Sequence, residues 1–594
     1  MKGNIYRELF AEEVTSKLEG QKVRIAGWIE QIRNLGANLM FLLIRDETGT
    51  IQVISNKPEE FNGVTRESTI TLEGIVKKRT PDMVNPNMKT GDIELELTSF
   101  EILGKCASTL PFEINHPENA SEETRLKYRY LDLRNEKHHQ TVLFRSKVID
   151  YMRSLMKELG FTEIATPIIT TSSPEGARDF VIPSRNYKGK FYALPQAPQI
   201  YKQLLMVSGF SKYFQIAPCF RDEDCRADRT LEFYQLDLEM SFATEEDVYS
   251  VGEKIFYNVF KTFGNKEVSP YPFRRISYKE AMLKYGSDKP DLRNPLIITD
   301  GSVLSESEFE PFKNKCIRII KASNVDKSNS WFKQIEEYVK SVGAHGLSYI
   351  KVNEDKSFKS SIDKYLNDNI RASLIKEYKL EANDVLFIIA DEPKKTPKLA
   401  GLLRTKLGKE LDLIDENRFE FCIINDFPMY EENEETGSLD FGHNPFSMPK
   451  GGLEALNNED PLNITAIQYD FVCNGYEMSS GAVRNHDIEI MKKAFDIVGY
   501  NENVIKNKFR SLYTAFQYGA PPHAGMAPGI DRIIMLLTGE ENLREVQIFP
   551  PNVSGVDLLM GGPNELDEKQ LRELHIKVRD LNWTPKVGQF INSF

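Results

Sequence analysis

The sequence predicts a multidomain α+β protein, and three observations lead to that fold class. The chain has 594 residues, whereas one domain commonly takes about 150. Residues 1–105 alternate apolar and polar side chains as half-buried strands do, while later segments also repeat apolar residues at helical spacing. Polar segments separate these regions. We therefore expect the divisions 1–105, 106–140, 141–287, 288–425 and 426–594.

The first division has the pattern of a small β-barrel. Ile93–Leu97 alternates with strict period two, and Asp46–Gly49 has the composition of a hairpin turn. Further strand candidates are residues 22–29, 39–44, 50–54 and 69–76. Five short strands are typical of an OB-fold, which binds single-stranded nucleic acid on one face. The pattern alone leaves a plain β-domain with packed aromatic residues equally open.

Composition limits the partners and the compartment. The 76 basic and 88 acidic residues give a net charge of −12, so a nucleic-acid partner would need local basic patches. The six cysteines form no C-x-x-C pair, which is typical of a reducing compartment without zinc. The N-terminus has no signal-peptide core, and no run of 18 apolar residues occurs. We expect a soluble, cytoplasmic protein that does not enter a membrane.

The middle of the chain predicts a hinge, a long helix and an insertion. Residues 106–140 are polar and rich in Pro, Asn and Glu, as linkers are. Apolar residues at 148–159 repeat at helical spacing, and Gly160 follows as the residue that ends the helix. Residues 288–425 are expected to form an inserted α+β domain. Its predicted helices span 330–342, 360–379 and 397–411, and its predicted strands span 347–352 and 384–389.

Two stretches carry the chemistry. Phe220–Glu239 is dense in charge between apolar flanks, which predicts an antiparallel hairpin with a polar loop at Asp222–Thr230. That loop could be merely solvated, or Arg221 at its root could grip a phosphate bidentately. Ala520–Leu536 is a Gly/Pro-rich segment that runs into an apolar helix with Arg532 at the junction. Such a junction suits close approach to a polyphosphate.

Together, F-R-D-E at 220–223 and G-I-D-R at 529–532 resemble motifs 2 and 3 of the class II aminoacyl-tRNA synthetases. E-I-A-T-P at 163–167 resembles motif 1. Three more stretches are similar to the bacterial type of aspartyl-tRNA synthetase, namely PEGARDF (174–180), YALPQAPQIYKQLL (192–205) and NGYEMSSGAVR (474–484). The resemblance implies an OB-fold anticodon-binding domain, a linker, an antiparallel-sheet catalytic domain in two parts with a C-terminal extension, and an inserted α+β domain. It also implies a homodimer formed through the 148–159 helix.

The resemblance further implies an activity. L-Aspartate would react with ATP and Mg²⁺ to give aspartyl-adenylate and pyrophosphate, and aspartate would then pass to tRNA-Asp. Whether tRNA-Asn is a second acceptor, which would require a partner amidotransferase, stays open. The 36–41 loop looks longer than in strict relatives, which favours the relaxed form. The alternatives are a catalytically inactive, synthetase-like tRNA-binding protein and an asparaginyl or lysyl enzyme. No G-x-x-x-x-G-K-[ST] loop occurs, which excludes P-loop ATP binding.

Site residues follow from the resemblance, position by position. The implied ATP contacts are Arg221, Glu223, Phe233, Glu477, Gly529, Ile530, Asp531 and Arg532, of which Arg221, Glu223 and Arg532 are catalytic. The implied aspartate contacts are Glu175, Gln199, Lys202, Arg221, Asp237, His443 and Arg484. Mg²⁺ would be held by Asp470 and Glu477, although spacing alone favours two edge-strand acids. The anticodon contacts would be Arg33, Phe41, Gln52 and Glu94.

The chain also departs from the family pattern. The differing positions are Ala197 for Ser, Thr230 for Gln, Asn444 for a second His, Ala524 for Gly and Pro528 for an aromatic residue. All of these changes leave the charged candidates in place.

Overall fold

The computed structural model describes residues 3–36, 38–172, 176–433 and 436–579. Internal contacts divide the chain into two compact units, Met1–Ala120 and Ser121–Phe594, and each is described by itself. The division between the units falls inside the predicted 106–140 linker. The part of that stretch after the division contains two helices, α1 (Glu122–Lys127) and α2 (Arg129–Asp132). Both belong to the second unit. No helix among the described residues is long and apolar enough to cross a bilayer.

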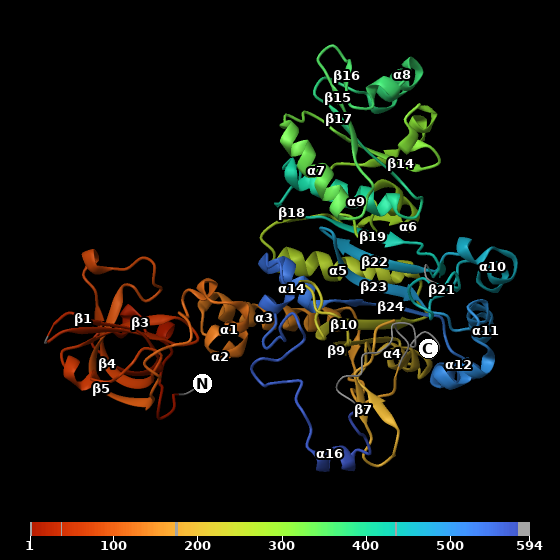
Figure 1. The fold of residues 1–594 in the computed structure, drawn as a ribbon. Helices are drawn as coiled ribbons and strands as arrows, with labels where there is room; N and C mark the ends of the chain where they lie inside the picture. Colours follow the sequence, from red (N-terminus) through yellow and green to blue (C-terminus); the bar gives the residue numbers. More distant parts are fainter. Residues whose placement is uncertain (1–2, 37, 173–175, 434–435, 580–594) are drawn as a thin grey trace. The chain divides into compact units, whose positions relative to one another are not determined.

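The first unit is the predicted OB-fold. Its strands are β1 (Lys22–Asn34), β2 (Met40–Arg45), β3 (Thr50–Ser55), β4 (Thr69–Lys78) and β5 (Ile93–Gly104). They close a barrel in the order β1-β2-β3-β5-β4 (Figure 1). β1 runs past its predicted end because it changes partner, pairing with β4 up to Trp28 and with β2 from there on. In the β2–β3 turn, Thr48 N–H donates to the Asp46 carboxylate at 2.8 Å.

The second unit contains an eight-stranded sheet in the order β12-β19-β22-β23-β24-β10-β9-β6 (Figure 1). Neighbouring strands are antiparallel except at the two ends, where β12 with β19 and β6 with β9 are parallel. The strands are β6 (Thr162–Glu163), β9 (Lys212–Phe220), β10 (Glu232–Ser241), β12 (Arg274–Ser277), β19 (Phe421–Asn425), β22 (Gln468–Cys473), β23 (Tyr476–Val483) and β24 (His523–Pro528).

Strand alternation gives the sheet two different faces. Leu236 and Leu238 of β10 pack into one apolar core with residues of α3 (Glu136–Glu158), α5 (Glu245–Phe263) and α14 (Ile530–Thr538). The intervening residues of β10 point to the opposite face, because successive side chains on a strand alternate. Helices therefore cover one face, and the other face is left for a site.

The long helix and the inserted domain follow the predictions with shifted starts. α3 begins at Glu136, twelve residues before the apolar stripe, because Asn135 caps it, and Gly160 after its end has φ +82°. In the insertion, α8 begins at Asp368 rather than 360, because the Asn367 side chain caps it there. The other predicted helices are α7 (Asn329–Ser341) and α9 (Thr396–Glu410).

The inserted domain has its own five-stranded sheet in the order β13-β14-β17-β15-β16. These strands are β13 (Ile298–Asp300), β14 (Cys316–Ala322), β15 (Ser348–Val352), β16 (Phe358–Lys359) and β17 (Val385–Asp391).

The α-helices not yet named lie outside the insertion and are α4 (Gln199–Val207), α6 (Tyr278–Lys284), α10 (Gly452–Asn458), α11 (Ile488–Ile497), α12 (Glu502–Lys508), α13 (Arg510–Ala515), α15 (Leu543–Val546) and α16 (Glu568–Glu573). Short two-stranded ribbons pair β7 (Val181–Pro183) with β8 (Phe191–Ala193), β11 (Glu267–Val268) with β18 (Arg418–Phe419), and β20 (Tyr430–Glu432) with β21 (Leu439–Phe441).

Candidate active site

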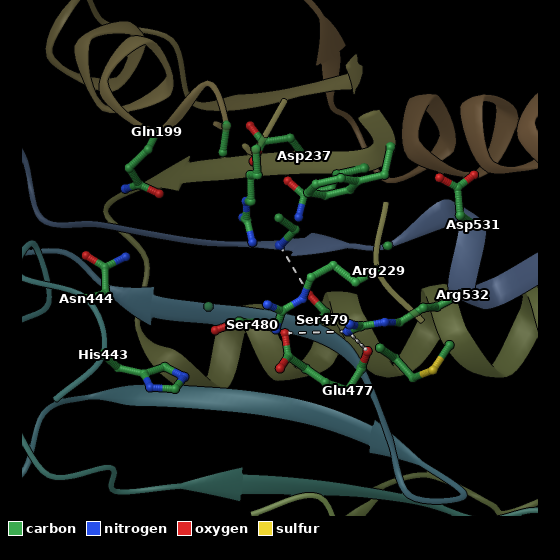
Figure 2. Close-up of a pocket in the computed structure, with 18 of the residues that line it drawn as sticks. Gln199, Arg229, Asp237, His443, Asn444, Glu477, Ser479, Ser480, Asp531 and Arg532 are labelled. Atoms are coloured by element: carbon green, nitrogen blue, oxygen red, sulfur yellow. Dashed lines mark hydrogen bonds and ion pairs between the residues drawn. The ribbon is translucent and has the colours of Figure 1, made fainter. Parts of the chain in front are cut away.

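A cavity of about 520 Å³ lies over the open face of the large sheet (Figure 2). Twelve of the residues named from the sequence line it: Gln199, Lys202, Arg221, Glu223, Phe233, Asp237, His443, Glu477, Arg484, Gly529, Asp531 and Arg532. They come from α4, the β9–β10 hairpin, β23, the start of α14 and the loop before α10. Segments up to 333 residues apart therefore meet at one site.

One end of the cavity is a buried group of alternating charges. Lys202 Nζ lies 2.7 Å from Asp237 Oδ1 and 3.3 Å from Glu239 Oε2. Arg484 completes the group, with its Nε 2.9 Å from Glu239 Oε1 and its Nη2 3.2 Å from Oε2. The four side chains are at most 3 % exposed. Burial without pairing would cost several kcal/mol per charge, so these groups hold one another in place.

The pKa values of these groups report the pairing. Burial opposes ionisation of Glu239, but Arg484 and Lys202 outweigh it and hold the pKa of that carboxyl below its ordinary value. Burial raises the pKa of Asp237, and Lys202 offsets only part of that effect. Gly525 makes the packing possible, since a Cβ there would lie 2.1 Å from Glu239 Oε2. We call Lys202, Asp237, Glu239 and Arg484 the buried quartet.

A second layer supports the buried quartet. His523 is fully buried, its Nδ1 lies 2.8 Å from the Pro521 carbonyl, and its Nε2 lies 3.2 Å from Gln203 Oε1. Burial lowers the pKa of His523, and Arg484 and His486 add to that effect while Glu239 opposes it. The imidazole is therefore kept neutral beside Glu239.

Several buried polar atoms around the cavity have no hydrogen-bond partner among the residues that the structure describes. They are Gln199 Nε2, Arg221 Nε, Asp237 Oδ2 and both carboxylate oxygens of Asp470. Buried polar groups are rarely left unpaired in folded proteins, so such a set indicates a polar ligand. The set contains donors and acceptors, which fits a ligand that carries both ammonium and anionic groups.

The ion pairs at the other end of the cavity are more exposed, and those of Arg532 are longer. Arg532 Nη1 donates to the Glu477 carbonyl at 2.8 Å, while its nearest carboxylate oxygens are those of Asp228 at 3.7 Å and Glu477 at 3.9 Å. Glu223 Oε2 pairs with Arg229 Nη1 at 2.8 Å. Figure 2 shows Arg229, Glu477 and Arg532 converging on this end. These cations are free to exchange protein carboxylates for another anion.

Glu477 and Asp470 form a carboxylate pair beneath that end. Glu477 Oε2 lies 3.0 Å from Lys289 Nζ. Asp470 is 1 % exposed, and burial together with the neighbouring Glu477 raises its pKa well above the ordinary value. For Glu477, burial opposes the charge, but Lys289 and Arg532 keep its pKa below the ordinary value. The register of β22 and β23 shifts between Phe471 and Val472, which places both acids on the same face of the sheet.

The aromatic and amide residues shape the walls. The Arg221 guanidinium carbon lies 5.0 Å from the centre of the Phe233 ring. His443 stacks on Phe427 with ring centres 5.1 Å apart. Asn444 accepts a bond from Phe446 N–H at 2.9 Å, so this departure from the family pattern caps its own loop. Phe233 and His443 thus offer flat surfaces to a ligand.

Two candidates named from the sequence do not line the cavity, and a third is not among the described residues. Ile530 is fully buried in the apolar core behind the sheet rather than on the cavity wall. Asp470 is likewise beneath the wall. Glu175 is outside the described residues. Asp531 lines the cavity, but its carboxylate pairs with Arg145 of α3 and accepts from Tyr234 N–H at 3.2 Å, so it also holds motif 3 against motif 2.

The four anticodon candidates share the outer surface of the barrel. Phe41, Gln52 and Glu94 each lie between two buried neighbours, so their side chains point outward. Phe41 pairs across strands with Arg33, and Gln52 Nε2 donates to Glu94 Oε2 at 3.0 Å. Arg79 lies 3.5 Å from the same Glu94 oxygen and extends this face.

Among the residues that line or support the site and that sequence reasoning did not find are four charged ones: Asp228, Arg229, Glu239 and Lys289. A signal existed for Glu239, since it follows Asp237 by two positions on one strand and must share its face. Lys289 carried no signal, because it lies at the base of the insertion, 188 residues from Glu477. Only the fold brings it to the cavity.

Comparison with known proteins agrees with this architecture. Residues 121–553 match the family described as tRNA synthetases class II (D, K and N), and residues 23–103 match the OB-fold nucleic acid binding domain. Because the first match covers well over half of the chain, the protein belongs to the class II tRNA synthetases of the D, K and N group.

Relatives with curated names are similar over nearly the full length. A protein of Streptomyces coelicolor named aspartate–tRNA ligase is 49% identical, with 97% of this chain and 99% of the relative covered. A protein of Rickettsia akari named aspartate–tRNA(Asp/Asn) ligase is also 49% identical, with 96% and 97% covered. An asparaginyl-tRNA synthetase from Pyrococcus horikoshii, solved with asparaginyl-adenylate, shares the fold at a TM-score of 0.56 and 20% identity, covering 92% of this chain and 98% of that one.

Proposed function

We propose that this chain is an aspartate–tRNA ligase, which forms aspartyl-adenylate from L-aspartate and ATP and then transfers aspartate to the 3′ end of tRNA. The observation that carries the proposal is the buried quartet beside a cavity with cations at its far end. Relatives of both tRNA specificities named above are ligases, which argues against the inactive alternative.

The first step needs no general base. The α-carboxylate of aspartate is already ionised at neutral pH and can attack the α-phosphate directly. Catalysis then rests on placing the two groups together and stabilising the charge that develops on phosphorus. Arg221, whose Nε has no protein partner, is suited to bridge the reacting carboxylate and the α-phosphate. Arg532, with its distant carboxylates, is suited to the outer phosphates.

Mg²⁺ fits the two carboxylates beneath the nucleotide end. Asp470 has two unpartnered oxygens, and Glu477 lies at the cavity wall beside it. One or two carboxylates plus phosphate oxygens is the usual protein environment of Mg²⁺. When bound there, the ion would neutralise charge on the phosphates. In the absence of the ion, Lys289 pairs with the Glu477 carboxylate and Arg532 donates to the Glu477 carbonyl, and both contacts orient this residue.

The buried quartet explains a choice of aspartate over asparagine. Lys202 and Arg484 both reach the cavity wall and both carry fixed positive charge beside it. The side-chain carboxylate of aspartate would accept from both. The amide of asparagine would turn an NH₂ towards a cation and leave it unpaired, which costs roughly 1–3 kcal/mol or more in a buried site. The substrate ammonium would lie near Asp237 Oδ2, which has no partner.

The tRNA would be read by the outer barrel face that carries Arg33, Phe41, Gln52 and Glu94. An exposed aromatic ring with flanking hydrogen-bonding groups is the usual way in which OB-folds hold bases. The direct experiment is charging of purified tRNA-Asp and tRNA-Asn, separately, with labelled aspartate. Comparable charging of both would identify a non-discriminating enzyme that requires a separate amidotransferase. Charging of tRNA-Asp alone would identify a dedicated ligase, and charging of neither would contradict the proposal.

A homodimer would complete the enzyme. Exposed apolar side chains occur in the segment after β6 and in β7 and β8, which a bridge between Thr170 and Ala193 joins: Ile168, Ile169, Val181, Phe191 and Tyr192. Contiguous exposed apolar residues of this kind commonly mark a protein interface. Light scattering should therefore give twice the monomer mass. The scattered cysteines support a location in the reducing cytoplasm.

A further inference from the structure

A short helix behind the cavity joins two parts of the catalytic unit. α15 (Leu543–Val546) carries Arg544, which is 7 % exposed. Its guanidinium binds Glu122 of α1 through Nε at 2.6 Å and Nη2 at 3.4 Å. Its Nη1 donates to the backbone carbonyl of Arg226 at 3.3 Å. One side chain thus connects the first helix of the unit to the loop between β9 and β10.

That loop has an outer side and an inner side. Its tip is a tight turn in which Arg226 and Arg229 exchange backbone hydrogen bonds of 2.9 and 3.4 Å. α15 holds the outer side at Arg226, through Arg544, and at Ala227, whose carbonyl accepts from Leu543 N–H at 2.8 Å. The next two residues face the cavity, where Asp228 approaches Arg532 and Arg229 pairs with Glu223.

The same segment holds the root of the hairpin. Gln547 Nε2 donates to Thr230 Oγ1 at 3.1 Å, to the Glu232 carbonyl at 3.0 Å and to Asp531 Oδ2 at 3.2 Å. Arg129 of α2 in turn donates to the carbonyl of Gln547 at 2.9 Å. Motifs 2 and 3 are therefore tied together from behind by residues that do not touch the cavity.

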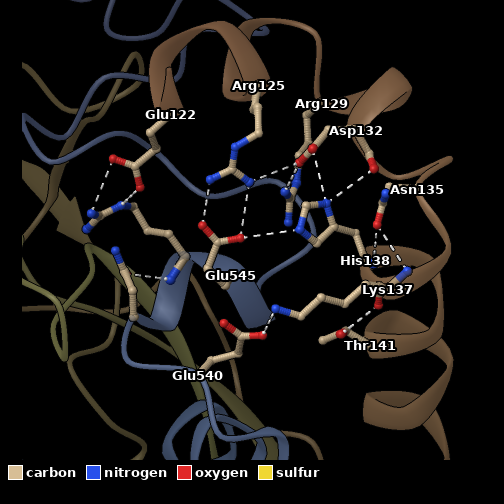
Figure 3. Close-up of polar contacts among 12 residues, drawn as sticks. Glu122, Arg125, Arg129, Asp132, Asn135, Lys137, His138, Thr141, Glu540 and Glu545 are labelled. Atoms are coloured by element: carbon tan, nitrogen blue, oxygen red, sulfur yellow. Dashed lines mark hydrogen bonds and ion pairs between the residues drawn. The ribbon is translucent and has the colours of Figure 1, made fainter. Parts of the chain in front are cut away.

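The helices before α3 are tied to α15 by further charges (Figure 3). Arg125 binds Glu545 at 2.7 and 3.2 Å, and His138 Nε2 lies 3.6 Å from the same carboxylate. Asp132, which is fully buried, pairs with Arg129 and His138. This network joins residues 122–138 to residues 543–548 at the point where the chain enters the catalytic unit.

We propose that Arg544 is a positioning residue for the nucleotide end of the cavity. Glu122 orients its guanidinium, the guanidinium fixes the Arg226 carbonyl, and the fixed turn presents Asp228 and Arg229 to Arg532 and Glu223. Helix α1 thereby acts on ATP binding through a side chain that never contacts ATP. The inference rests on the proposed function, because it assigns that end of the cavity to the nucleotide.

The test is aspartate-dependent ATP–pyrophosphate exchange with the full chain, comparing Arg544→Met with Arg125→Met. Both arginines are largely buried and belong to the same network, but Arg125 has no recorded contact with the loop. Arg544→Met should raise the KM for ATP roughly 3- to 30-fold, the range seen for residues that couple sites at a distance. Its KM for aspartate should stay within about twofold, because the buried quartet is untouched. Arg125→Met should lower the Tm as much and leave both KM values unchanged.

A second variant, Glu122→Ala, tests whether Arg544 depends on its contact with Glu122. Glu122→Ala should raise the KM for ATP in the same direction but less, and the double variant with Arg544→Met should be no worse than Arg544→Met alone. Equal effects of Arg544→Met and Arg125→Met, an unchanged KM for ATP in Arg544→Met, or additive effects of Glu122→Ala would each overturn the inference. Failure of the unaltered protein to exchange pyrophosphate would instead contradict the proposed function.

Discussion

The two ends of the cavity solve different problems with the same residue types. At the amino-acid end, Lys202 and Arg484 lie on α4 and at the end of β23, are at most 3 % exposed, and contact carboxylates at 2.7 to 3.3 Å. At the nucleotide end, Arg532 and Arg229 are 28 % and 46 % exposed, and Arg532 lies 3.7 Å or more from any recorded carboxylate partner.

The difference follows from what each end must do. A fixed arrangement of buried charges can reject an uncharged isostere, because the misfit cannot relax. A polyphosphate is bound best by cations whose own ion pairs in the protein are weak. Each ion pair that must be broken on binding lowers the affinity for the ligand. Under the proposed function, residues on regular secondary structure would select the amino acid, and residues on a loop and a helix start would bind the nucleotide.

The largest effect is expected from Lys202→Met. It leaves Asp237 and Glu239 buried with one cation fewer, so kcat/KM for aspartate should fall roughly a thousandfold and the fold should lose about 3–5 kcal/mol. Pyrophosphate exchange and urea unfolding measure the two effects. Exchange at the unaltered rate in a folded Lys202→Met protein would remove this residue from the amino-acid end.

Arg532→Ala should chiefly affect ATP. Loss of one cation aimed at developing phosphate charge commonly costs a hundredfold or so in rate. We expect a drop of about that size in kcat/KM for ATP, with stability nearly unchanged because its ion pairs are loose and partly exposed. Arg275→Ala, which breaks an exposed pair with Glu246, is the matched control and should alter neither. If Arg532→Ala weakened aspartate binding and ATP binding equally, the proposed difference between the two ends would be wrong.

Asp470→Asn tests the carboxylate pair. The amide keeps the shape but removes one of two negative charges, so the Mg²⁺ concentration that gives half-maximal exchange should rise about tenfold. Titration of Mg²⁺ at saturating ATP measures this shift. An unchanged requirement would mean that Asp470 is a structural acid of the strand, as its spacing alone suggested.

The smallest effect concerns pH. Because the pKa of His523 is below its ordinary value of 6.5 in the folded protein, the unfolded chain takes up a proton that the folded chain refuses. Its contribution to stability is therefore complete above pH 6.5 and is lost as the pH falls, by at most about 1.4 kcal/mol per pH unit. His523→Gln should flatten the fall in Tm between pH 6.5 and 5. A steeper fall in the variant would reverse the sign of this account.

The sequence predicted the parts of the molecule that depend on local pattern. The five barrel strands and the β9–β10 hairpin follow from alternation, and the charged candidates follow from motifs of contiguous residues. It did not predict Lys289, because its partner Glu477 is far away in the sequence and lies close to it only in the folded protein. Helices α1 and α2 were also not predicted, because Arg129 looks like a linker residue until its bonds to the carbonyls of Gln547 and Ile548 are known.

Ile530 shows a different limit of motif-based prediction. It belongs to the G-I-D-R motif, yet its side chain packs into the apolar core, whereas Asp531 and Arg532, the next two residues of α14, line the cavity. A motif marks a stretch of backbone, and only the helix phase decides which of its side chains reach the ligand.

The most direct measurement is pyrophosphate exchange by the unaltered protein with aspartate and with asparagine at equal concentrations. The fixed charges of the buried quartet predict exchange with aspartate and a kcat/KM for asparagine at least about a hundredfold lower. Comparable exchange with both amino acids would contradict the account, because it would show that Lys202 and Arg484 do not read the charge of the substrate.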